Sequence, residues 1–154
     1  MKVKFIILGC GSSLGVPNAA GNWGNCNPRE RKNYRTRCSA LIKSKNKNIL
    51  IDTSPDLRYQ LLKNNISNID RVFYSHKHAD QVHGINDLRV FYLKRRKKIP
   101  VYADDKTKKY LIENFSYCFK KSNEYEAILQ INRIYKNFSF FDEGKDRKST
   151  RLNS

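Results

Sequence analysis

The sequence lacks a long apolar segment. No apolar run approaches the roughly 18 residues that a membrane-spanning helix requires, so we expect no membrane association. The first eight residues alternate charged and bulky side chains, and they lack the apolar core and the small-residue cleavage site of a signal peptide. These absences lead us to expect a cytoplasmic protein.

Cysteine is scarce and never closely paired. The chain contains only Cys10, Cys26, Cys38 and Cys118, and no two of them form a C-x-x-C motif. In a cytoplasmic chain such cysteines are free and reduced rather than bridged. Cys26 lies in a stretch rich in glycine, asparagine and proline, which leaves two alternatives open: a remnant of a structural metal site, or an isolated small side chain.

Acidic residues are also few. The chain has 14 Asp+Glu against 31 Lys+Arg, which gives a formal net charge of +17. Such a charge favours a nucleic-acid partner, because clustered basic residues release counterions from phosphate groups. The basic residues are scattered, however, apart from the run from Lys94 to Lys98. We therefore keep a non-catalytic basic nucleic-acid-binding domain as an alternative and favour a solvated basic surface.

Short apolar runs and helical spacings alternate along most of the chain, and 154 residues are enough for one domain. Residues 9–37 show no regular period, and so long an irregular segment is usually functional. Ser54 as N-cap and Pro55 as the first helical residue indicate a helix start. The order of elements predicts an α/β fold with a mixed sheet. We expect strands at 5–8, 39–42, 48–51, 72–74 and 101–103, and helices that begin at Pro55 and that include 85–92 and 110–115.

The final stretch of the chain has a different composition. From Asp142 to Ser154 the only large apolar residue is Leu152. Two interpretations are open: a frayed basic tail, or a segment at 146–154 that is not native and resembles translated sequencing-adapter sequence. The second interpretation implies a truncated reading frame.

The three histidines of the chain, His76, His78 and His83, gather in one short segment together with Asp80. The segment directly follows the predicted strand at 72–74, and α/β folds usually place ligands at the carboxyl ends of strands. Two imidazoles and a carboxylate so close together are suited to hold one or two divalent metal ions. The alternative is a solvent-facing loop in which the histidines only make hydrogen bonds.

Residues 76–81 resemble the His-x-His-x-Asp-His signature of the metallo-β-lactamase-fold hydrolases. The segments at 8–17, 23–26 and 50–58 resemble the branch of that family that contains the phosphoribosyl cyclic phosphodiesterase, the PhnP-like branch. The resemblance implies a metallo-β-lactamase αββα sandwich. This chain would supply its N-terminal half, a mixed sheet with helices on one face.

The resemblance also implies roles for individual residues. His76 and His78 would bind a first metal and Asp80 a second, and Asp80 would also act in catalysis by orienting a water. Asp52 matches an acidic residue that supports the metal-binding loop by contacting the metal ligands rather than the metal. Judged without the family, Asp52 is equally well a strand-end or capping carboxylate. The family centre commonly holds two ions, Zn²⁺ or Mn²⁺, which would activate the water and clamp the phosphate oxygens.

The chain departs from the family pattern at two sites. Gln81 stands at the position of the last histidine of the signature, and an amide is a poorer metal ligand than an imidazole. The second metal site would therefore be weak, differently liganded or empty. His83 would compensate for this loss, or it is a surface histidine at a helix start. Related proteins need several cysteines near Cys26 to hold a structural zinc, so we expect no such zinc here.

A third departure is length. Members of the family are longer and take further metal ligands from their second half, whereas no histidine follows His83 in this chain. We therefore expect residues 1–141 to be the N-terminal part of a metallo-β-lactamase-like domain, with little or no activity alone. Residues 142–154 would be a basic tail that is not native.

The leading functional hypothesis is a metal-dependent hydrolase, a phosphodiesterase that acts on a small cyclic phosphate or nucleotide through a metal-activated water. An RNA-processing nuclease of the same superfamily is an alternative that the positive charge favours and Gln81 disfavours. Tyr34, Arg35 and Arg37 are candidates for contacting an anionic substrate, or they are plain surface residues. Whether the chain forms a homodimer is left open.

Overall fold

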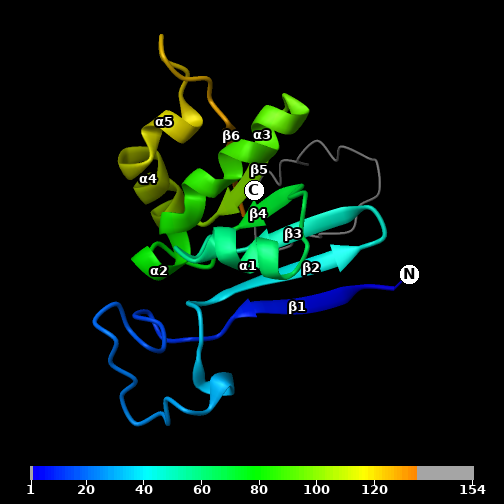
Figure 1. Cartoon of the computed structure of the whole chain (residues 1–154). Helices are drawn as coiled ribbons and strands as arrows, with labels where there is room; N and C mark the ends of the chain where they lie inside the picture. The colour runs from blue at the N-terminus through cyan, green and yellow to red at the C-terminus, as the bar shows by residue number, and fades with distance from the viewer. Residues whose placement is uncertain (1, 135–154) are drawn as a thin grey trace, which may run out of the picture.

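The computed structural model describes residues 2–134 of the chain. Its centre is a six-stranded sheet whose strands lie side by side in chain order (Figure 1). The first three strands are antiparallel neighbours, and the remaining strands run parallel to the third. The sheet is therefore mixed, as the sequence predicts. The strands are β1 (Lys4–Gly9), β2 (Ser39–Ser44), β3 (Lys47–Ile51), β4 (Arg71–Phe73), β5 (Ile99–Ala103) and β6 (Leu129–Arg133).

Helices connect the parallel strands. One helix joins β3 to β4, a group of three joins β4 to β5, and two join β5 to β6. Figure 1 shows these helices gathered on one side of the sheet. This is the arrangement of helices on one face that the sequence resemblance implies. The helices are α1 (Leu57–Lys63), α2 (Ala79–Val82), the 3-10 helix η2 (His83–Leu88), α3 (Arg89–Arg95), α4 (Asp105–Asn114) and α5 (Ser116–Phe119).

The hydrophobic core lies between these helices and one face of the sheet. Leu50 of β3 and Val72 of β4 are fully buried in the same cluster as Leu57 of α1. Successive side chains of a strand point to opposite faces. In the edge strand β1, Phe5 and Ile7 face the other side and are each 65% exposed. One face of the sheet is thus covered, and at β1 the other face is open.

The strand β6 is absent from the sequence prediction. Its five residues include only two large apolar side chains, Leu129 and Ile131, separated by the polar Gln130. So short an alternating pattern is weak on its own. The strand forms because it pairs in parallel with β5 along its whole length.

The start of α1 also differs from the prediction. The helix begins at Leu57, with Asp56 as its N-cap. The Ser54 hydroxyl accepts a hydrogen bond from the Asp56 backbone N–H at 3.1 Å, and the Ser54 carbonyl accepts one from Leu57 at 2.9 Å. Ser54 therefore closes a turn ahead of the helix. The prediction of Ser54 as N-cap and Pro55 as the first helical residue is wrong.

The irregular segment between β1 and β2 folds back along the end of the sheet. It contains a bridge between Gly11 and Arg37 and the short 3-10 helix η1 (Arg31–Asn33). The buried Gln60 of α1 donates a hydrogen bond from Nε2 to the Arg37 carbonyl at 2.8 Å. The long segment is thus attached to α1 close to the carboxyl end of β3.

No helix among residues 2–134 is both long enough and apolar enough to cross a membrane. The predicted tail at 142–154 lies outside the described residues. The division of the chain at residue 141 stays a prediction.

Candidate metal centre

The histidine segment begins where β3 and β4 end. The two strands are parallel neighbours, so their carboxyl ends meet at the same edge of the sheet. Asp52 follows β3, and Ser75 and His76 follow β4. The Asp52 carboxylate accepts two hydrogen bonds from Ser75, one from its backbone N–H at 2.7 Å and one from its hydroxyl at 2.6 Å. The same hydroxyl lies 2.9 Å from His76 Nδ1.

These contacts select the tautomer of His76. A hydroxyl has one proton, and the Ser75 hydroxyl donates it to the Asp52 carboxylate. The Ser75 oxygen must then accept a hydrogen bond from the N–H at His76 Nδ1, which leaves the lone pair of the ring on Nε2. An imidazole in this state is ready to bind a metal, since metal-bound histidines typically donate their other N–H to a supporting oxygen. Asp52 therefore orients His76 through Ser75.

Asp52 occupies an unusual and buried position. Its backbone φ of 59° lies in the left-handed region, which costs a residue other than glycine about 1–3 kcal/mol. Hydrogen bonds to both sides of its backbone hold it there, to Phe73 at 2.8 Å and from Ser39 at 3.0 Å. The side chain is buried, and burial raises the pKa of Asp52 more than the hydrogen bonds from Ser75 lower it. The surrounding fold thus holds the Asp52 backbone in a strained conformation and keeps its carboxyl group buried at this edge of the sheet.

His76 and His78 lie side by side. Their ring centroids are 4.5 Å apart, and the rings meet edge to face at 75°. Lys77, between them, has its ammonium 5.9 Å from the ring centre of Tyr110 in α4. Both histidine side chains are exposed to solvent. The short extended segment before α2 therefore presents two imidazoles together at the surface.

Asp80 and Gln81 lie in the first turn of α2. The Gln81 amide nitrogen donates a hydrogen bond to Asp80 Oδ2 at 2.9 Å. The Gln81 side chain is buried, and its Oε1 has no hydrogen-bond partner. The Gln81 backbone carbonyl accepts a hydrogen bond from the Thr53 backbone N–H at 2.7 Å, which ties α2 to the end of β3. Gln81 thus contacts the predicted metal ligand next to it.

The histidine pair fits a divalent metal as part of a ligand set. Among residues 2–134, no three His, Cys, Asp or Glu side chains lie close enough together to hold a metal ion. The structure therefore brings His76 and His78 together but does not gather Asp80 with them into a complete set. The donor chemistry does fit, because two adjacent imidazoles, one with Nε2 left for a metal, are typical zinc ligands.

His83 has different surroundings. It lies at the start of η2, and its ring meets the ring of Phe115 edge to face, with centroids 5.8 Å apart. This contact connects η2 to the residues between α4 and α5. The His83 ring therefore packs against Phe115 within the layer of helices.

Arg37 forms an ion pair with Asp56. Its Nε and Nη2 donate to the two carboxylate oxygens of Asp56 at 2.9 and 2.7 Å, and its backbone N–H donates to the same group. The Arg37 guanidinium holds the pKa of Asp56 below its ordinary value. Tyr34, Arg35 and Arg37 all line one cavity of about 280 Å³, and Asp56 lines it too. The three candidates for substrate contact thus lie together at this cavity, where Arg37 is paired with Asp56.

Sequence reasoning missed two parts of this site. Ser75 connects Asp52 to His76, and its position directly before the histidine was the one available signal. Cys38 lies at the same edge of the sheet, with its thiol 3.1 Å from the Gly11 carbonyl. Burial, and then the nearby charge of Asp80, raise the pKa of the Cys38 thiol.

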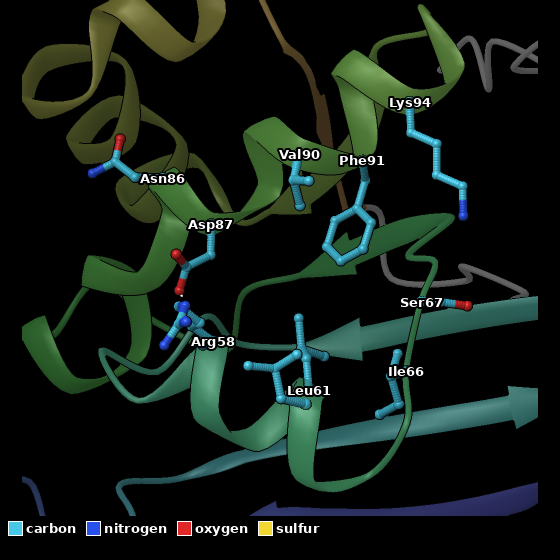
Figure 2. Close-up of a pocket in the computed structure, with 10 residues that line it drawn as sticks. Arg58, Leu61, Ile66, Ser67, Asn86, Asp87, Val90, Phe91 and Lys94 are labelled. Carbon is cyan, nitrogen blue, oxygen red and sulfur yellow. Dashed lines mark hydrogen bonds between the residues drawn. The ribbon is translucent and has the colours of Figure 1, made fainter.

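A cavity of about 550 Å³ lies between α1 and α3 (Figure 2). Leu61 and Ile66 form one wall and Phe91 the other, and Lys94 lies at one end. None of the candidate metal ligands lines this cavity. The chemistry therefore lies at the edge of the sheet and not in this apolar hollow.

The fold and the histidine segment define a class of protein. Residues 47–149 match the family model described as a beta-lactamase superfamily domain. The chain belongs to this family.

Individual relatives refine this assignment. The chain is similar to a crystallised diphosphatase from the PhnP family, with a TM-score of 0.76 and 31% identity over 89% of this chain and 52% of that one. Zn²⁺-bound PqqB from Methylobacterium extorquens has a TM-score of 0.63 at 20% identity, over 86% of this chain and 46% of that one. That second likeness concerns the fold alone. The chain spans about half the length of these structures.

A curated relative carries a different name. An octanoyltransferase from Porphyromonas gingivalis is 37% identical over 121 residues, which are 78% of this chain and 24% of that protein. Most of the named protein therefore lies outside the match.

Proposed function

We propose that this chain supplies the first metal ligands of a phosphodiesterase that acts on a small cyclic phosphate or nucleotide. The observation that carries the proposal is the hydrogen-bonded series from Asp52 through Ser75 to His76, with His78 alongside. The name of the PhnP-family diphosphatase, which is 31% identical, supports a phosphorus ester or anhydride as substrate.

In this proposal, His76 and His78 bind the first metal ion and Asp80 belongs to the second. The whole protein holds two ions, Zn²⁺ or Mn²⁺. Such ions activate a water at neutral pH and neutralise phosphate charge. Zinc sites use three or four protein ligands, and the chain spans about half the length of the PhnP-family diphosphatase, so in this proposal the rest of the whole protein completes the set.

Each described residue then has a distinct task. Asp52 and Ser75 keep a proton on His76 Nδ1, so that Nε2 is free to bind a metal. His78 adds the second nitrogen donor. The carboxylate of Asp80, held by Gln81, accepts a proton from water and orients it.

Hydrolysis of a bis-aryl phosphodiester by the full gene product tests this proposal. We expect turnover that a chelator abolishes and that added Zn²⁺ or Mn²⁺ restores. The His76→Ala variant should lose at least 100-fold in kcat/KM. Turnover that survives both the chelator and the variant would overturn the proposal.

A nuclease is the second candidate, favoured by the formal charge of +17. The basic run from Lys94 to Lys98 lies at the end of α3, where it would contact phosphates. Within it, however, Arg95 is bonded to the Asp70 carboxylate at 2.7 Å and to the Ile69 carbonyl at 2.6 Å. Binding of single-stranded RNA at 50 and 200 mM salt separates the candidates, since a nuclease or nucleic-acid-binding domain loses affinity steeply over this range.

A further inference from the structure

Two cysteines stand at the two ends of the long irregular segment between β1 and β2. Cys10 directly follows β1, and Cys38 directly precedes β2. Figure 1 shows the segment leaving and re-entering the sheet at the same end of these two strands. Both thiols are exposed, so an oxidant in solution can reach them.

The strand pairing sets the two cysteines opposite each other. The two residues that flank Cys10 pair with the two residues that flank Cys38. These pairs are Gly9 with Ser39 and Gly11 with Arg37. Facing residues of paired strands have Cα atoms about 4.5–5.5 Å apart, and disulfides span Cα separations of about 4.4–6.8 Å. A disulfide between the two cysteines would therefore need only rotation of their side chains.

The glycines on either side of the first cysteine let the two chains approach closely. A Cβ atom on Gly9 would clash with the Arg37 carbonyl oxygen, and one on Gly11 would lie 2.8 Å from the Thr36 carbonyl oxygen. The Gly11 N–H donates to that Thr36 carbonyl at 2.7 Å. The backbone is thus held against the facing chain both before and after the first cysteine.

The Cys38 thiol lies against the chain that carries Cys10. Its Sγ donates a hydrogen bond to the Gly11 carbonyl at 3.1 Å. Burial, then the charge of Asp80 and then that of Cys10, raise the pKa of the Cys38 thiol. Because the thiolate is the nucleophile, Cys38 is poorly suited to react first with an oxidant.

We propose that Cys10 and Cys38 form a reversible disulfide that closes the irregular segment at its base, with hydrogen peroxide as the oxidant. The Cys10 thiolate attacks one peroxide oxygen, the O–O bond breaks, and protonation of the leaving oxygen gives water and a sulfenic acid on Cys10. The Cys38 thiol then attacks the sulfenic sulfur, and a second water leaves as the S–S bond forms. Two thiols thus give two electrons to one peroxide, and a dithiol reductant restores them by exchange.

The disulfide would constrain the segment that carries the three candidates for substrate contact. Tyr34, Arg35 and Arg37 all lie between the two cysteines and line the cavity of about 280 Å³. A cross-link at the base of this segment removes conformational freedom from the unfolded chain. The oxidised protein should therefore unfold at a higher urea concentration than the reduced protein. The inference goes beyond the proposed function, because it holds whatever reaction the metal centre performs.

Peptide mapping of the full gene product tests the inference. The protein is treated with a small molar excess of hydrogen peroxide in the presence of a chelator, alkylated with iodoacetamide and digested without reductant. Trypsin separates Cys38 from Cys10, and chymotrypsin, which cleaves after Trp23, separates Cys10 from Cys26. Mass spectrometry should find the peptides of Cys10 and Cys38 linked, and dithiothreitol should release them.

Cys26 provides the matched control. It is an exposed cysteine of the same segment, and Cys26→Ser should form the link at the wild-type rate. Cys10→Ser should slow the oxidation of Cys38 about tenfold or more and should abolish the shift in urea resistance. If Cys10→Ser fails to fold by circular dichroism, Cys38→Ser leaves the sulfenic acid on Cys10 without a partner. Dimedone should then label Cys10 about tenfold more than in wild type.

The outcomes decide the inference without any activity measurement. A link that forms in folded wild type and in Cys26→Ser, and that dithiothreitol reverses, would support it. A Cys10 thiol that stays free while the folded protein is oxidised elsewhere would overturn it, as would a link from Cys10 to Cys26. A link that forms equally fast in urea-unfolded protein would also overturn it, because the fold would then not be what brings the two thiols together.

Discussion

Two carboxylates on either side of the turn at Ser54 have opposite electrostatic environments. Asp52 is 7% exposed, and burial raises its pKa although Ser75 donates two hydrogen bonds to it. Asp56 is only partly buried, and Arg37 lowers its pKa. Asp52 therefore orients His76 through Ser75 although burial disfavours its charged form. Asp56 instead attaches the long segment between β1 and β2 to α1. One carboxylate serves the candidate site, and the other serves the fold.

The largest effect that this comparison predicts is a loss of zinc binding in Asp52→Asn. The amide has one oxygen to accept the Ser75 backbone N–H, and its NH₂ group then faces the Ser75 hydroxyl and donates to it, so the hydroxyl is free to donate to His76 Nδ1 instead. The ring proton then moves to Nε2 and blocks the metal. We expect zinc affinity to fall about 10- to 100-fold, which calorimetry would measure. Asp56→Asn is the matched control and should keep wild-type affinity; equal losses in both variants would contradict the distinction.

The next effect is on stability. Asp56→Ala removes three hydrogen bonds to Arg37, two of them from the guanidinium. The pair is partly exposed, and water screens part of its energy, so we expect the free energy of unfolding to fall by about 2 kcal/mol. Urea denaturation measures this loss, which should shrink in 1 M salt. A change below about 0.5 kcal/mol would show that the segment is attached by other contacts.

The pH dependence of stability should have opposite signs for the two carboxylates. The lowered pKa of Asp56 means that its contribution is present above about pH 4 and is lost as the pH falls through the folded-state pKa. The raised pKa of Asp52 means that its contribution is present below about pH 4 and is lost as the pH rises through the folded-state pKa.

Urea denaturation between pH 3 and 7 would measure both signs. The stability difference between wild type and Asp56→Asn should grow as the pH rises. The difference between wild type and Asp52→Asn should shrink over the same range. Slopes of the same sign for both variants would show that burial does not govern the pKa of Asp52.

The smallest effect concerns an exposed pair, Lys109 and Glu113 in α4, whose charged atoms are 3.9 Å apart. Lys109→Ala should change the free energy of unfolding by less than about 0.5 kcal/mol, because exposed pairs of this kind contribute little. Urea denaturation would check this value. A loss as large as that of Asp56→Ala would mean that partial burial is not what strengthens the Arg37 ion pair.

Much of the fold could be predicted from local patterns in the sequence. The apolar runs of β1 to β5 are long enough to be recognised, and Asp104 caps α4 where the acidic pair at its start indicates a helix. Strand β6 could not be recognised, because its stability comes from pairing with β5. The start of α1 was misplaced because a serine before a proline suits a turn as well as an N-cap.

The residues of the candidate site could be predicted from the sequence, but the hydrogen bonds between them could not. The clustering of His76, His78 and Asp80 is visible in the sequence, and so is the substitution at Gln81. The hydrogen bonds from Ser75 to Asp52 depend on the parallel pairing of β3 with β4, which no local pattern encodes. Such contacts between distant segments appear only in the folded chain.

A zinc titration of three forms of the full gene product tests the central claim most directly. The forms are wild type, the double variant His76→Ala/His78→Ala, and His83→Ala. The account predicts that the double variant loses zinc binding, whereas His83→Ala, whose ring packs against Phe115, retains wild-type affinity. Zinc binding that survives in the double variant, or that disappears in His83→Ala, would contradict the account.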